Sequence, residues 1–145
     1  IEWPVVVMLA AMIPVGQALE TSGISLNIAN FISASTEGLG LPWLILMILV
    51  ITMFVSDIVN NAATAVIMAP IAANLALQVG QPVEPFLMAV AVGASCAFLS
   101  PIGHQCNTLV MAPGNYKFGD YWRLGLPLEC VIVAISIPMI LFVWT

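Results

Sequence analysis

The sequence predicts an all-α, polytopic membrane protein, and three observations support that prediction. Of the 145 residues, 62% are hydrophobic and only 6% are charged, with a mean hydropathy of +1.13, whereas soluble domains carry about 25% charged residues. Residues 38–56 and 58–83 contain no charged side chain. The apolar stretches show no alternation of polar and apolar residues, which excludes a membrane barrel. At about 20 helical residues per crossing, the chain holds about four or five crossings.

Charge and motif content exclude several function classes. Two basic residues, Lys117 and Arg123, stand against seven acids, for a net charge of −5. Nucleic-acid binding requires clustered Lys and Arg, so we expect no nucleic-acid partner. The three cysteines form no CxxC pair, so no zinc site or disulfide framework is expected. No catalytic motif such as GxSxG or HExxH is present, and we expect no enzyme and no cofactor.

The first half of the chain divides into a leading segment and a hairpin. Residues 3–40 predict a first helix, which stops at 20–23, and a more polar connecting helix that is too polar to cross easily. Residues 41–80 predict a helical hairpin, with an apolar arm at 41–55 and a second arm that ends at 80–82.

The second half predicts a broken helix and a final helix. Residues 84–113 are apolar up to position 99, break at 100–107 and resume for one or two turns. A loop at 113–123 then leads into the last helix, at 124–145.

The first polar interruption, at 56–64, falls where an apolar span would otherwise continue. An ionised Asp57 at the bilayer centre costs about 3 kcal/mol on insertion scales, so this patch faces protein or water. Ser56, Asn60 and Asn61 supply the oxygens that hard cations such as Na⁺ prefer, and a helix that begins near Ala62 points free N–H groups at an anion. The alternative is a hairpin tip that is merely solvated.

The second interruption is built on Pro101 and Gly103. Proline removes an N–H donor and glycine permits unusual backbone angles, so a helix cannot continue through both. Broken backbone at membrane depth is tolerated where it is buried in protein or lines a cavity. A simple proline kink is the alternative. Two breaks in consecutive segments are typical of binding sites in secondary transporters, and they make transporter the leading function class.

Two titratable residues at the breaks have a second interpretation. Asp57 and His104 are candidates for a proton or coupling role, because histidine titrates near neutral pH. A structural hydrogen bond to a nearby carbonyl is the competing interpretation for His104. Metal binding by His104 with Cys106 lacks further ligands.

At these breaks the sequence resembles the divalent anion:Na⁺ symporter family of the ion transporter superfamily. Residues 56–65 and the run to Pro70-Ile71 are similar to the family's Ser-Asn-Thr hairpin signature. Residues 101–108 resemble the unwound segment of the next helix, and residues 114–128 are similar to the family's ending. The resemblance implies a re-entrant hairpin and a broken helix in one half of an inverted-repeat transporter. The chain would then be the C-terminal repeat, with an N-terminal half of the same transporter as its partner.

The resemblance also implies ligands and partners. Na⁺, as coupling ion, would be bound by Ser56, Asn61 and Gly103. The anion would be bound by residues of the hairpin tip and the second break: Asn60, Asn61, Ala62, Asn107 and Thr108. Members form homodimers in the lipid bilayer, and we expect a multi-pass protein of the plasma membrane.

The hairpin signature departs from the family pattern in a way that bears on the substrate. Asn60 and Ala62 replace a Ser and a Thr whose hydroxyls would contact carboxylates in dicarboxylate carriers. Sulfate or a similar divalent anion is therefore favoured, with a dicarboxylate second. The rival hypotheses are a cation/proton antiporter or arsenite-type carrier of the same superfamily, and a non-transporting membrane sensor.

Overall fold

The computed structural model describes residues 3–35 and 40–144, and in these ranges the fold is all-α, as the sequence predicts. Residues 36–39 of the predicted connecting segment and residue 145 of the predicted last helix lie outside the described residues. The helices in chain order are α1 (Trp3–Thr21), α2 (Ile24–Ser35), α3 (Leu41–Ile58), α4 (Asn61–Gln78), α5 (Glu84–Ala94), α6 (Gln105–Met111) and α7 (Phe118–Trp144).

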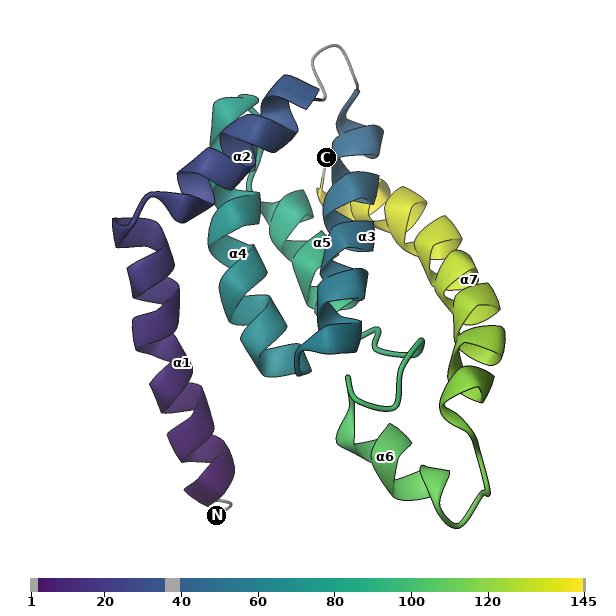
Figure 1. Ribbon diagram of the computed structural model, residues 1–145. Helices are drawn as coiled ribbons and strands as arrows, with labels where there is room; N and C mark the ends of the chain where they lie inside the picture. Colours follow the sequence, from purple (N-terminus) through teal and green to yellow (C-terminus); the bar gives the residue numbers. More distant parts are fainter. Residues whose placement is uncertain (1–2, 36–39, 145) are drawn as a thin grey trace.

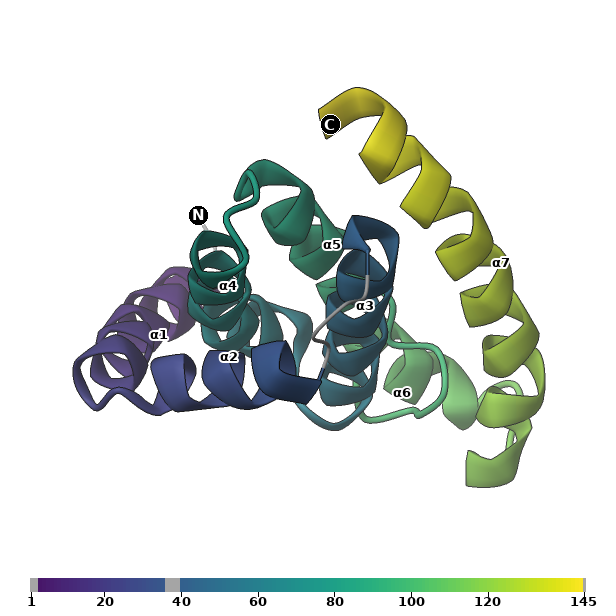
Figure 2. The same cartoon turned by 90° about the horizontal axis from the view of Figure 1, so that it is seen from above.

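The core lies where α5 packs against both arms of the α3–α4 hairpin (Figure 1). Ile48 of α3, Leu75 of α4 and Phe86 of α5 are completely buried there. Helices α1 and α2 contact α4, whereas α7 contacts α3 and α5 on the opposite side of the hairpin (Figure 2). The hairpin therefore separates the beginning of the chain from its end.

A glycine sets the distance between α3 and α5. A Cβ atom at Gly93 would lie 2.9 Å from both the Leu49 carbonyl oxygen and the Thr52 Cβ. Small residues allow this close backbone approach between apolar helices, which lipid does not drive together by the hydrophobic effect. The contact fixes the end of α5 beside the middle of α3.

Three of the described helices, α3, α4 and α7, are long and apolar enough to cross a membrane. The chain is therefore an integral, multi-pass membrane protein. Helices α2 and α5 are apolar but shorter. The predicted crossing at 84–113 is divided by its break into α5 and α6.

The first interruption is narrower than the sequence predicts. Helix α3 continues to Ile58, so that Ser56 and Asp57 lie in its last turn. Only Val59 and Asn60, both extended, separate α3 from α4. Helix α4 begins at Asn61, one residue before the predicted start, because the Asn60 side chain accepts a 2.8 Å hydrogen bond from the Ala63 N–H and caps the first turn.

The second interruption is wider than predicted, because α5 ends at Ala94 instead of near position 99. From Ala94 onward, backbone carbonyls accept hydrogen bonds from side chains of α3 and α6. The Ala94 carbonyl lies 2.9 Å from the Ser56 hydroxyl, and the Ala97 carbonyl accepts a 2.8 Å bond from the Asn107 amide. Such bonds satisfy the polar groups that a helix would otherwise pair, so the chain can leave the helix well before Pro101.

The last helix also begins earlier than predicted. Helix α7 starts at Phe118, and the loop expected at 113–123 shortens accordingly. The reason is local: the Asp120 carboxylate accepts a 2.8 Å hydrogen bond from the Lys117 N–H, which pairs a donor at the helix start. An acidic side chain in the first turn also interacts favourably with the helix dipole.

Candidate functional site

The tip of the α3–α4 hairpin and the end of α5 meet at one buried hydroxyl. Ser56 is completely buried. Its Oγ lies 3.0 Å from Asn61 Oδ1 and 2.9 Å from the Ala94 carbonyl oxygen. Both neighbours are acceptors, and the hydroxyl carries a single proton. Three oxygens therefore gather around one proton, at a completely buried side chain.

Residues 95–104, called the break from here on, are fastened to the hairpin by Asp57 and Ser100. Asp57 Oδ1 accepts a 2.9 Å hydrogen bond from the Leu99 N–H. The Ser100 hydroxyl donates to the Asp57 carbonyl oxygen at 2.5 Å. Ser100 Oγ in turn accepts 3.2 Å bonds from the N–H groups of Ile102 and Gly103. The irregular backbone of the break thus depends on α3 for its hydrogen bonds.

Gly103 packs directly on the last turn of α3. A Cβ atom at this position would lie 2.6 Å from the Ser56 carbonyl oxygen and 2.7 Å from the Ala97 Cβ. The φ angle of Gly103 is not positive, in contrast to those of Gly23 and Gly80. Close packing, and not the unusual backbone angle that the sequence suggested, is what requires glycine here.

The structure therefore brings together the three residues to which the family resemblance assigns Na⁺ binding. Ser56 contacts Asn61 through their side chains, and the Gly103 backbone lies against the Ser56 carbonyl. The Ala94 carbonyl joins them from the end of α5. Sequence reasoning missed Ala94, because no local pattern shows that α5 ends there.

The residues assigned to the anion fall into two groups. Asn60 and Ala62 lie at the start of α4, where the first N–H groups of a helix have no partner within the helix. Asn107 and Thr108 lie on α6, and their side chains donate to carbonyls of the break: Asn107 to Ala97 at 2.8 Å and to Ser100 at 3.2 Å, and Thr108 to Pro101 at 2.6 Å. In the part of the chain that the structure describes, no hydrogen bond joins the two groups.

Asp57 and His104, the candidates for a proton role, have different surroundings. Asp57 is only 6% exposed, and its Oδ2 has no hydrogen-bond partner among the described residues. His104 is exposed, and its Nδ1 accepts a 3.1 Å bond from the Cys106 N–H, so that it caps α6. The structural role of His104 is thus visible, although its partner is an N–H group.

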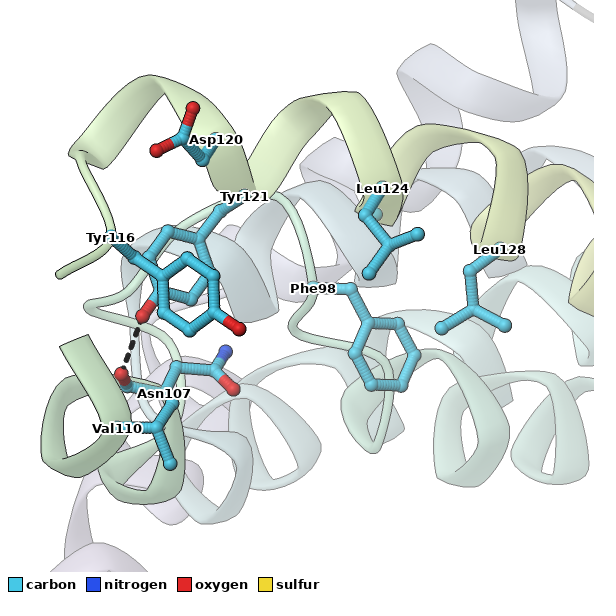
Figure 3. A pocket seen from close by; sticks show the side chains of 9 residues that line it. Phe98, Asn107, Val110, Tyr116, Asp120, Tyr121, Leu124 and Leu128 are labelled. Carbon is cyan, nitrogen blue, oxygen red and sulfur yellow. Dashed lines mark hydrogen bonds between the residues drawn. The ribbon is translucent and has the colours of Figure 1, made fainter. Parts of the chain in front are cut away.

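Two polar residues of α7 that the sequence analysis did not single out also face this region. The Tyr121 hydroxyl donates to the Asn107 carbonyl oxygen at 2.7 Å, beside a cavity of about 350 Å³ between α6 and α7 (Figure 3). Glu129 is partly buried, and its Oε1 has no hydrogen-bond partner in the described ranges. Glu129 is the only charged residue in 124–145, and a lone acid in a long apolar run is the signal that could have found it.

The fold and the site define a polytopic membrane protein whose apolar helices are interrupted at a shared polar junction. Interrupted helices of this kind form the binding sites of secondary transporters. The sequence model of the citrate transporter family matches residues 1–93 and 40–145. The chain belongs to this family, whose members are transporters and not enzymes.

Curated relatives of this chain are also transporters, and the chain is similar to a part of each. It is 39% identical over 140 residues to an uncharacterized transporter of Synechocystis, 31% over 137 to sodium/sulfate cotransporter 2 of Chlamydomonas reinhardtii and 32% over 135 to sodium-dependent high-affinity dicarboxylate transporter 3 of Caenorhabditis elegans. The alignments cover 97%, 94% and 92% of this chain but 23%, 16% and 24% of these relatives. The chain thus spans about a quarter or less of their length.

Proposed function

We propose that this chain is the C-terminal repeat of a secondary active transporter that couples Na⁺ to the movement of a divalent anion. The observation that supports the proposal best is the junction of Ser56, Asn61 and Ala94, where three oxygens surround one proton. Hard monovalent and divalent cations prefer oxygen ligands of this kind. Na⁺ would bind the Ser56 hydroxyl, the Asn61 amide oxygen and the Ala94 carbonyl, with the backbone of Gly103 closing the site.

The anion would bind at the start of α4. The N-terminus of a helix offers N–H groups and the positive end of its dipole to a negative charge. Asn60, Asn61 and Ala62 provide this end of α4. Asn107 and Thr108 would complete the site from α6 by exchanging their bonds to carbonyls of the break for bonds to the anion. An Na⁺ ion bound at Ser56 and Asn61 would attract the anion to the same helix end, which is a physical basis for coupling.

Sulfate is the favoured substrate and a dicarboxylate the second candidate. Relatives that are named as sodium/sulfate and as sodium-dependent dicarboxylate transporters both support a divalent anion. Asn60 and Ala62 lack the hydroxyls that the symporter signature would offer to a carboxylate. The whole transporter would comprise an N-terminal half as well, form a homodimer and work in the plasma membrane with Na⁺ as its coupling ion and no other cofactor.

The direct test is uptake of radiolabelled sulfate and succinate into liposomes that contain the full-length protein, with and without an inward Na⁺ gradient. We expect Na⁺-driven uptake, with sulfate preferred. Uptake that is independent of Na⁺ and follows a pH gradient would contradict Na⁺ coupling and favour the antiporter or arsenite-type carrier. Absence of flux in a folded protein would favour a sensor.

The Na⁺ site is tested by Asn61→Ala, which deletes an oxygen from the junction. We expect the Na⁺ concentration for half-maximal uptake to rise about tenfold, since loss of one group around a metal ion commonly lowers affinity by that order. Asn30→Ala, at an exposed position of α2, is the matched control and should leave Na⁺ activation unchanged. A normal Na⁺ dependence in a well-expressed Asn61→Ala protein would refute this ligand.

A further inference from the structure

Two acids lie within the apolar helices close to the junction, one on each side of the break. Asp57 is in the last turn of α3 and only 6% exposed, and Glu129 is near the middle of α7 and partly buried. A carboxylate at membrane depth is expensive, and such residues pair with other groups or bind ions. The two acids therefore require partners, and the structure shows what surrounds them.

Both acids face the same short stretch of the break. Asp57 Oδ1 accepts the Leu99 N–H at 2.9 Å from one side. From the other side α7 packs so closely that a Cβ atom at Gly125 would lie 2.7 Å from the Phe98 carbonyl carbon. Glu129 follows Gly125 by four residues and shares its face of the helix. Glu129 lines the same cavity as Leu99, the residue whose N–H donates to Asp57.

Each acid leaves one buried oxygen without a partner. Asp57 Oδ2 and Glu129 Oε1 are both inaccessible to solvent, and neither has a hydrogen-bond partner among the residues that the structure describes. An unpaired buried polar atom is costly, and more so when it carries charge. Two such oxygens, one on α3 and one on α7, make this region a candidate for binding a cation.

Within residues 3–35 and 40–144, no basic side chain neutralises the pair. The chain has two, Lys117 and Arg123, and both are exposed at the beginning of α7. The surroundings of Glu129 are otherwise apolar: it lines a cavity of about 410 Å³ between α3 and α7, together with Met53 and Leu99. A buried pair of like charges in such surroundings is stabilised by a cation with hard oxygen preference.

We propose that Asp57 and Glu129 form a second cation site, in which Asp57 Oδ2 and Glu129 Oε1 bind one Na⁺ ion. This site rests on the proposed function, because Na⁺ is the coupling ion there, but it is separate from the junction of Ser56, Asn61 and Ala94. An ion held between α3 and α7 would bring the break and α7 together. Its occupancy would therefore be linked to the packing of α7 against the hairpin.

The test is a titration that does not depend on transport. The thermal stability of the full-length protein in detergent is measured against NaCl, with choline chloride keeping the ionic strength constant. Ligands that bind the folded state raise its apparent stability with concentration. We expect Glu129→Gln and Asp57→Asn each to raise the Na⁺ concentration for half-maximal stabilisation about tenfold. We expect the free-energy effect of the double variant on Na⁺ binding to be no larger than the sum of the two single effects, because both residues bind one ion.

Glu84→Gln is the matched control, since Glu84 is exposed at the start of α5, and its titration should equal that of the wild type. If Glu129→Gln does not fold, Glu129→Asp keeps the charge and moves the oxygen, and it should show a weakened response to Na⁺. An unchanged Na⁺ response in a folded Glu129 variant would overturn the proposal. The proposal would also be overturned if the substitution altered only the pH dependence of stability and not its Na⁺ dependence, because a shared proton would then occupy the pair.

This result is distinguishable from that of the uptake experiment. Na⁺ stabilisation that requires Glu129, in a protein without Na⁺-driven uptake, would support the cation site and refute the proposed function. Na⁺-driven uptake with an unchanged titration in the Glu129 and Asp57 variants would do the reverse.

Discussion

The two interruptions of the apolar helices differ in what holds them. The hairpin tip comprises two extended residues, and a local contact closes it, because Asn60 caps the helix that it precedes. The break comprises residues 95–104, and its hydrogen bonds come from two other elements and from within: Asp57 of α3, Asn107 and Thr108 of α6, and Ser100 of the break itself. A short turn can be stable by itself, whereas a long irregular segment inside an apolar fold needs partners from other elements. The break is therefore the more vulnerable of the two regions.

The largest effect is expected where the break packs against the last turn of α3. Gly103→Ala places a Cβ atom 2.6 Å from the Ser56 carbonyl oxygen, and overpacking of this kind costs about 1–3 kcal/mol. We expect lower thermal stability of the full-length protein in detergent and a loss of Na⁺-driven uptake. Gly119→Ala is the matched control, because no atom lies within 4 Å of its added Cβ. Equal stability of the two variants would show that the break is not held against α3.

The next effect concerns Ser100, which donates to Asp57 and accepts from Ile102 and Gly103. Ser100→Ala leaves these backbone groups without their partner, at a cost of about 1–3 kcal/mol for each buried group that stays unpaired. Thermal unfolding should detect this loss. Ser95→Ala, which removes an exposed hydroxyl that bonds only within its own helical turn, should change stability far less. If the two variants unfold at the same temperature, the break does not depend on Ser100.

At the hairpin tip the expected effect on stability is smaller, because the contact is local. Asn60→Ala removes the cap of α4 and should cost about 1 kcal/mol. Asn60→Ser keeps a capping oxygen and should unfold like the wild type. The serine also restores a hydroxyl of the symporter signature, so we expect the ratio of succinate to sulfate uptake to rise. An unchanged ratio would show that Asn60 does not determine the substrate.

The smallest effect is expected at the contact between α6 and α7. Tyr121→Phe removes the hydroxyl that donates to the Asn107 carbonyl oxygen, which is worth about 0.5–1.5 kcal/mol. Tyr116→Phe, on the exposed ring that packs edge-on against Tyr121, is the control and should have no measurable effect. The measurement is a comparison of the unfolding temperatures of the two variants. Equal temperatures would exclude a role for the bond in stability.

Several features of the fold and the candidate site could be predicted from local sequence. Apolar runs without charge predict the membrane helices, and Ser56, Asn61 and Gly103 stand out because polar residues and glycine interrupt those runs. The extent of the break could not be predicted in this way. Pro101 marks a disruption, but α5 already ends at Ala94, because a serine far away in the sequence lies beside its last carbonyl.

The role of Glu129 could not be predicted from local sequence either. Its position in an apolar run is visible in the sequence, yet its importance depends on Asp57, which is more than seventy residues away. Nothing local states that the two acids face the same stretch of the break. The packing of Gly125 against Phe98, which brings α7 to that stretch, is likewise a tertiary contact.

Composition and hydropathy alone establish that this is a helical membrane protein. A chain with so few charged and so many apolar residues exposes apolar surface, which is favourable in lipid and unfavourable in water. Composition and hydropathy also locate the two places where the helices are interrupted, because proline, glycine, Asp and Asn disfavour a continuous apolar helix. Three features follow from tertiary packing: which oxygens gather around Ser56, where α5 ends, and which carboxylate oxygens have no partner among the described residues. The physical reason is that each of these features depends on a hydrogen bond or a close contact between residues far apart in the chain.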